Sequence, residues 1–80
     1  MPVIHVSILE GRSVDVKRAY IKALTDCSVE ILRCRPESVA VVLSEMSFDH
    51  YGRGGKMKLD ELTEAGLTVE TYHAREAKKT

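Results

Sequence analysis

The segment VIHVSILEGRS, residues 3–13, decides the fold of this chain. Its first seven residues are rich in β-branched side chains, which is typical of a strand, and Gly11 then ends the strand in a turn. Ser13 is placed to cap a helix, and Asp15 adds negative charge to the first turn of that helix. The segment therefore predicts a strand over residues 3–9 that leads directly into a helix.

A long helix and a second strand complete the unit that this segment begins. Apolar residues recur at helical spacing from Val14 to Cys34, and Pro36 stops the helix. The predicted apolar stripe consists of Val16, Ala19, Tyr20, Ala23, Leu24, Cys27, Ile31 and Cys34. Residues 39–46 form a near-continuous apolar run, typical of a strand that is buried on both faces. The three elements predict a β-α-β unit with parallel strands and a right-handed crossover.

The rest of the chain is richer in glycine and then in charge. Residues 47–55 hold three of the five glycines, which predicts a loop and a tight hairpin. A short helix is expected to start over Thr63–Ala65 and to end at Gly66, and a helical tail is expected over Thr68–Lys79. We predict an α+β domain over residues 1–60 and a C-terminal extension over residues 61–80, which packs on the same or a neighbouring subunit.

Composition excludes several classes of function. The 80 residues carry 12 Lys+Arg and 12 Asp+Glu, and a net charge of zero argues against a nucleic-acid partner. No apolar run approaches the roughly 18–20 residues that cross a bilayer, so no membrane partner is expected. No export signal is recognisable, and we expect a cytoplasmic protein. Cys27 and Cys34 lie two helical turns, ~10 Å, apart, too far for a disulfide, and are interpreted as buried small hydrophobes.

Pro2 and Arg12 are the first candidates for chemistry. Removal of Met1 would give Pro2 a free secondary amine, with a reference pKa of ~7.7–8.0, which can act as a general base near neutral pH. If Met1 is retained, that nitrogen is an amide and takes no proton. Arg12 follows a glycine at the end of a strand, where it either holds a carboxylate or lies in solvent.

The three histidines do not indicate a metal site. His5 lies within the first strand among apolar neighbours and is interpreted as a structural or interface residue. His50 and His73 have no acidic or cysteine partners at metal-ligand spacing. We predict neither a metal nor a cofactor.

The order of these segments resembles the 4-oxalocrotonate tautomerase family. The resemblance runs from residue 2 to about residue 58 and rests on Pro2, ILEGRS at 8–13, a valine-rich strand that ends Glu45-Met46, and HYGRGG at 50–55. It implies a tautomerase/MIF-like β-α-β fold in a hexamer or a trimer of dimers, with active sites shared between subunits. It also implies that Met1 is removed and that Pro2 moves a proton between carbon and oxygen of a small unsaturated 2-hydroxy or 2-keto acid.

The resemblance assigns roles to further residues. Arg12 matches the arginine that binds the substrate carboxylate, Tyr51 matches the aromatic residue that lowers the polarity around the proline, and Leu9 matches an apolar pocket wall. The second arginine of the family aligns with Ala40, and the loss of such a charge-assisted contact costs roughly 1.5–3 kcal/mol, or ~10–150-fold in rate. We hypothesise that Arg53 supplies the missing cation; the alternative is that Arg53 points into solvent.

Three functions remain open from the sequence. The leading one is a tautomerase with Pro2 as its base and a small carboxylate as its substrate. The second uses protonated Pro2 as an acid in the hydration, dehalogenation or decarboxylation of a short acid. The third is a weakly active oligomeric protein with a non-catalytic role. Oligomerisation itself is expected because one helix covers one face of the sheet and leaves an apolar face for another subunit, of the same or a different chain.

Overall fold

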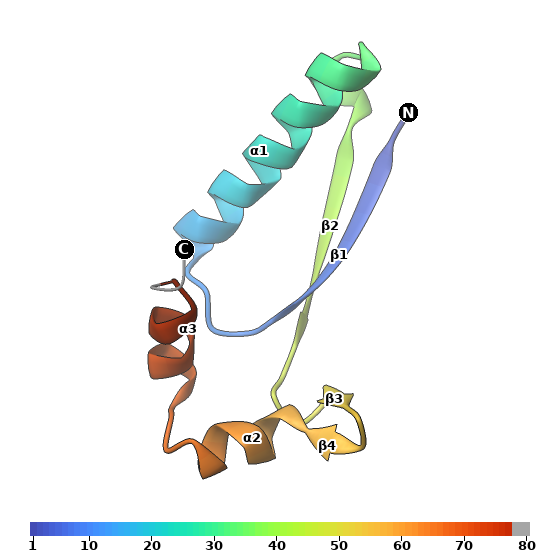
Figure 1. The fold of residues 1–80 in the computed structure, drawn as a ribbon. Coiled ribbons are helices and arrows are strands. Elements are labelled where there is room, and N and C mark those ends of the chain that lie inside the picture. Colours follow the sequence, from blue (N-terminus) through green and yellow to red (C-terminus); the bar gives the residue numbers. More distant parts are fainter. Residues whose placement is uncertain (78–80) are drawn as a thin grey trace. The chain divides into compact units, whose positions relative to one another are not determined.

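A computed structural model describes residues 1–77, which form two compact units. The first unit holds Met1–Ile8 and Arg12–Ser44, and the second holds Leu9–Gly11 and the chain from Glu45 onward. In chain order (Figure 1) the elements are β1 (Val3–Leu9), α1 (Val14–Leu32), the 3-10 turn η1 (Pro36–Ser38), β2 (Ala40–Met46), β3 (Gly52–Arg53), β4 (Lys56–Met57), α2 (Lys58–Glu64) and α3 (Val69–Ala77).

β1 and β2 lie side by side in a two-stranded sheet. Where both strands begin, the N–H of Ala40 donates to the carbonyl oxygen of Pro2 over 3.0 Å. Where both end, the N–H of Glu10 donates to the carbonyl oxygen of Met46 over 2.9 Å. Strands that begin together and end together run parallel, so the predicted β-α-β unit with its long crossover helix is confirmed.

The two ends of α1 have separate local causes. Ser13 caps the start as predicted, because its Oγ accepts a hydrogen bond from the N–H of Val16 over 3.2 Å. The helix ends at Leu32, before the predicted end at Cys34. Arg33 adopts the left-handed conformation, with φ at 57°, and its N–H donates to the carbonyl oxygen of Val29. A left-handed residue stops a helix, and apolar spacing does not reveal it.

α1 lies along one face of the sheet (Figure 1). The side of the helix that is half-buried differs from the apolar stripe that the sequence predicts. Its half-buried residues are Lys17, Leu24, Thr25, Ser28 and Val29. Most of the predicted stripe is exposed, including Val16 at 51% and Ile31 at 70%. Cys27 is exposed as well, so its interpretation as a buried residue is wrong. Apolar residues surround much of this helix, and one sheet covers only one side of it.

The sheet presents one half-covered face and one open face. Ile4, Val6 and Ile8 of β1 are half-buried, as is Leu43 of β2. On the open face, the exposed fraction is 54% for Val3 and 42% for Val42. His5 also lies on this face and is exposed.

A two-residue turn connects β3 and β4 in the second unit. The strands pair antiparallel, with Gly52 opposite Met57 and Arg53 opposite Lys56. Gly54 and Gly55 between them have positive φ values of 63° and 80°, which a tight two-residue hairpin turn requires. The hairpin predicted from the glycine run is confirmed.

α2 begins at Lys58, earlier than the start over Thr63–Ala65 that the sequence predicts. The N–H groups of Lys58 and Leu59 donate to the carbonyl oxygens of Tyr51 and Phe48, over 2.8 and 2.9 Å. A segment outside the helix therefore satisfies donors that a helix start leaves without partners, and local composition does not reveal this support. The helix stops before Gly66, which has a φ of 70°, as predicted.

α3 (Val69–Ala77) lies within the predicted tail over Thr68–Lys79, of which Lys78 and Lys79 fall outside the described residues. Among residues 1–77 the buried hydrophobic side chains are Phe48 and Leu62, with 2% and 6% of their surface exposed. Both belong to the second unit. No helix in this part of the chain combines the length and the apolar character needed to cross a bilayer.

Candidate active site

Pro2 stands immediately before β1 and is half-buried. Its carbonyl oxygen accepts the hydrogen bond from Ala40 that joins the two strands at their start. Met1, which precedes it, is 91% exposed. Removal of Met1 would therefore cost little packing and would leave the nitrogen of Pro2 as the end of the chain, next to an ordered strand.

Arg12 follows Gly11 and precedes the helix cap Ser13. It lines a cavity of about 290 Å³ in the first unit, together with Ile8, Val16, Lys17 and Tyr20. The walls thus combine two cationic side chains, one phenol and two aliphatic side chains. Such walls suit a small acid, because cations bind its carboxylate and aliphatic groups cover its carbon chain.

Lys17 and Tyr20 are members of this cavity that the sequence analysis did not identify. The sequence contains one indication that Tyr20 belongs to this cavity. Val16 and Tyr20 follow Arg12 at steps of four residues, and so the two lie on one side of the first turns of α1. The same spacing placed Val16 and Tyr20 in the predicted apolar stripe, whereas Lys17 lay outside it, and neither assignment indicated a position beside Arg12.

Pro2 and Arg12 flank opposite ends of β1 within the first unit. The seven residues of the strand, at about 3.3 Å each, separate its two ends by about 23 Å. That distance exceeds the length of a small acid. Within one copy of the chain, one small acid therefore does not span the two ends of this strand.

Tyr51 and Arg53 both belong to the second unit, but Tyr51 lines a cavity and Arg53 does not line that cavity. Tyr51 is half-buried and lines a cavity of about 270 Å³ whose other walls come mainly from the hairpin. Arg53 is exposed on β3, opposite Lys56. Leu9, the last residue of β1, is half-buried. Arg12 and Tyr51 thus line different cavities, one in each unit.

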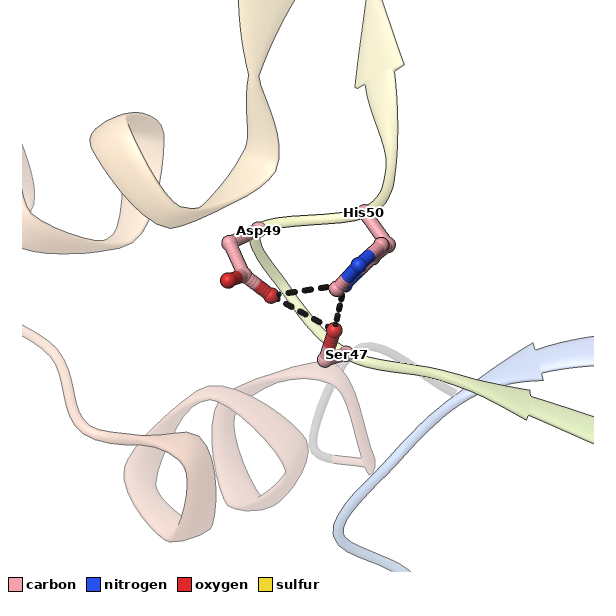
Figure 2. A network of polar contacts seen from close by, with 3 residues as sticks. All are labelled: Ser47, Asp49 and His50. Atoms are coloured by element: carbon pink, nitrogen blue, oxygen red, sulfur yellow. Dashed lines mark hydrogen bonds and ion pairs between the residues drawn. The ribbon is translucent and has the colours of Figure 1, made fainter.

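A polar network closes the turn that follows β2. Figure 2 shows Ser47, Asp49 and His50 with their side chains pointing toward one another. Oγ of Ser47 donates to Oδ1 of Asp49 over 2.5 Å, and Nδ1 of His50 lies 2.9 Å from the same oxygen and also hydrogen-bonds to Ser47. The serine and the aspartate both meet Nδ1, whereas nucleophilic catalysis needs them on opposite ring nitrogens. The network therefore stabilises a turn and does not form a catalytic triad.

The same contacts change the acidity of Asp49. The hydrogen bond from Ser47, followed by the one from His50, holds the pKa of the Asp49 carboxyl below its usual value. This network is not among the sites that the sequence predicts, although Ser and Asp at this spacing are typical of side chains that hydrogen-bond within turns.

Comparisons with known proteins agree with this architecture. The sequence pattern of the family described as "Tautomerase enzyme" matches residues 2–61. A probable tautomerase of Halalkalibacterium halodurans is 44% identical over 61 residues, which cover 76% of this chain and 100% of that protein.

Solved structures show the same fold. A structure from work on the 4-oxalocrotonate tautomerase isozymes of Methylibium petroleiphilum has a TM-score of 0.76 and is 30% identical, covering 79% of this chain and 98% of that one. A heterohexamer 4-oxalocrotonate tautomerase from Chloroflexus aurantiacus has a TM-score of 0.72 at 23% identity, covering 75% of this chain and 97% of that one, a likeness of fold alone. With the family pattern matched over residues 2–61, this chain belongs to the tautomerase family.

Proposed function

We propose that this chain is a cofactor-independent isomerase that moves a proton between carbon and oxygen of a small unsaturated 2-hydroxy or 2-keto acid. The nitrogen of Pro2, freed by removal of Met1, is the base, and Arg12 holds the substrate carboxylate. The observation that carries this proposal is the cavity of about 290 Å³ where Arg12 and Lys17 lie beside aliphatic walls. The two cationic side chains can bind the carboxylate of an unsaturated acid, and the aliphatic walls can contact its carbon chain.

The proposed chemistry is a proton transfer through one group. The uncharged nitrogen of Pro2 takes the proton of the 2-hydroxyl group, and the O–H electron pair becomes the new C=O π bond. The electron pair of the C=C bond moves along the chain, and a carbon atom takes the proton back from the prolinium. Arg12 stabilises the negative charge that develops beside the carboxylate. An α-amino group, with a reference pKa of ~7.7–8.0, is suited to both halves of this transfer.

The site is proposed to combine Pro2 of one copy with Arg12 of another. The separation of about 23 Å along β1 supports this arrangement, because a small acid does not bridge it. The exposed apolar side chains of Val3 and Val42 on the sheet, and of Ile31 on α1, support their burial in an assembly. We propose a hexamer or a trimer of dimers, of one chain or of two. Sedimentation of the protein as a stable 8.9 kDa monomer at micromolar concentration would contradict it.

Tyr51 and Leu9 are proposed to shape the environment of the proline. Both are half-buried, as side chains that exclude water from a site need to be. Arg53 is exposed in a glycine turn, where its long side chain has room to reach a substrate in an assembled site. We propose that it replaces the guanidinium that Ala40 cannot supply.

Ala40 also favours a second candidate function. Alanine next to Pro2 removes one cation from a diacid site, which shifts preference toward short monoacids. Protonated Pro2 would then act as an acid in hydration, dehalogenation or decarboxylation. The pH profile separates the two functions: kcat/KM rises through the pKa of the proline if the amine is a base, and falls if it is an acid.

The test begins with the intact mass of the purified protein and continues with the ketonisation of 2-hydroxymuconate. We expect loss of Met1 and a fall of about 10²–10⁴-fold in kcat/KM for Pro2→Ala. Pro36→Ala changes the other proline of the chain, in η1, and serves as the control that keeps its activity. Retention of Met1 together with an inactive protein would favour a non-catalytic role. Full activity of Pro2→Ala would exclude Pro2 as the base.

A further inference from the structure

α3 contacts the turn that directly precedes Arg12. Nε2 of His73 lies 2.6 Å from the carbonyl oxygen of Glu10, and the two residues are 63 positions apart in the sequence. A carbonyl oxygen only accepts hydrogen bonds, so Nε2 carries the proton and donates it. Both residues belong to the second unit. The helix at one end of the chain thus fixes a peptide plane near the other end.

Gly11 shows how closely α3 approaches this turn. Its φ is 116°, a conformation that side chains rarely adopt. A Cβ atom on Gly11 would lie 2.4 Å from Cγ1 of Val69 and 2.8 Å from the ring of His73. The backbone of the turn and two side chains of α3 are therefore in direct contact, without room for a methyl group.

A cluster of three rings connects α3 to the segment after β2. The ring of Phe48 meets those of Tyr72 and His73 edge to face, with centroids 5.5 and 6.1 Å apart. Tyr72 and His73 are themselves 5.2 Å apart. Phe48 is 2% exposed, and its carbonyl oxygen accepts from the N–H of Leu59 at the start of α2. His73 therefore belongs both to a buried ring cluster and to a hydrogen bond with the Glu10 turn.

We infer that α3 is a clamp on the turn at Glu10 and Gly11 and that His73 is a positioning residue. His73 holds the peptide that directly precedes Arg12, and the ring cluster around Phe48 holds His73 in place. The inference rests on the proposed function of Arg12 as the carboxylate anchor. α3 lies outside residues 2–61, over which the family pattern matches, so the clamp is an addition to the shared fold.

Two substitutions of His73 separate its hydrogen bond from its packing. His73→Phe keeps a ring against Phe48 and Tyr72 but has no donor for Glu10. His73→Gln keeps a donor but loses the ring. Ala74→Gln introduces the same amide at the neighbouring exposed position of α3 and serves as the control.

The kinetic test asks whether a substitution of His73 changes KM or kcat for 2-hydroxymuconate. Removal of the hydrogen bond should raise KM about 5- to 10-fold in His73→Phe, because Arg12 meets the carboxylate less often in the correct geometry. The value of kcat should fall by a smaller factor than KM rises, because Arg12 binds the carboxylate both before and during the proton transfer, and His73→Gln should restore KM to within about twofold of wild type. If kcat falls with the folded fraction and KM stays constant, His73 is only a structural residue and the inference is wrong.

Amide hydrogen exchange supplies a readout that is independent of activity. The N–H of Glu10 donates to Met46, so its exchange reports whether the turn is held. We expect its exchange to be about 5- to 10-fold faster in His73→Phe and unchanged in Ala74→Gln. A wild-type protein without tautomerase activity would overturn the proposed function, whereas equal exchange in wild type and His73→Phe would overturn the clamp.

Discussion

The N–H of Ala40 donates a hydrogen bond to the carbonyl oxygen of Pro2, which fixes an alanine beside the residue proposed as the base. The alanine is exposed, so a longer side chain fits at this position without displacing packed atoms. We expect the small size of Ala40 to limit the substrate, and its side chain can be changed without disturbing this hydrogen bond, which uses only backbone atoms.

Ala40→Arg in an Arg53→Ala background should raise kcat/KM for a 2-hydroxy diacid by about 10-fold or more, because a guanidinium provides a charge-assisted hydrogen bond worth roughly 1.5–3 kcal/mol. Steady-state kinetics with 2-hydroxymuconate measure this change. Ala40→Gln in the same background has a similar length without the charge and should stay near the Arg53→Ala parent. Equal gains in both variants would show that length rather than charge matters.

Arg53→Ala should lower kcat/KM by about 10-fold if Arg53 supplies the second cation. Lys56→Gln is the matched control, since Lys56 lies opposite Arg53 in the hairpin and its ion pair with Glu64 is at the surface. The same ketonisation assay applies to both variants. Unchanged kinetics in Arg53→Ala would remove this residue from the mechanism.

Gly11→Ala should destabilise the folded chain by more than the roughly 1–2 kcal/mol that a positive φ costs a residue other than glycine. The added methyl group also collides with Val69 and His73 of α3. Gly54→Ala separates the two causes, because Gly54 has a φ of 63° and no atom within 4 Å of its Cβ position. Urea unfolding of both variants gives the difference, and equal destabilisation would contradict the close packing of α3.

Asp49→Asn should change how Tm depends on pH in the acidic range. The pKa of Asp49 is lowered in the folded chain, mainly by the hydrogen bond from Ser47 and next by the one from His50. The ionised carboxylate therefore contributes its full share to the free energy of unfolding above the unfolded pKa of about 3.9. That contribution is lost as pH falls through the lower, folded pKa. The difference in Tm between wild type and Asp49→Asn should therefore be constant above about pH 5 and narrow below the unfolded value. A difference that widens in acid would show that the carboxylate is not stabilised by the turn.

Local patterns predicted the elements whose causes are local. β1, the Ser13 cap and the glycine hairpin each follow from a few adjacent residues, and the structure confirms them. The start of α2 was not predictable in this way, because its first N–H groups are satisfied by carbonyl oxygens of Phe48 and Tyr51.

The candidate site was partly predictable for a related reason. The place of Arg12 after a glycine at the end of a strand left open whether it holds a carboxylate or lies in solvent, the family resemblance favoured the first, and the structure places it at the wall of a cavity. Lys17 and Tyr20 were not identified, because their part in the cavity depends on which side of α1 meets the sheet. Periodicity shows that a helix has an apolar side, but the covering sheet selects the side that is used.

The proposed pairing of Pro2 from one copy with Arg12 from another would make turnover depend on the assembled oligomer, because no single polypeptide would then hold a complete site. An oligomer assembled from Pro2→Ala chains and Arg12→Ala chains would contain some interfaces where an intact proline faces an intact arginine. Two inactive preparations, unfolded and refolded together, would then complement each other and recover part of the turnover.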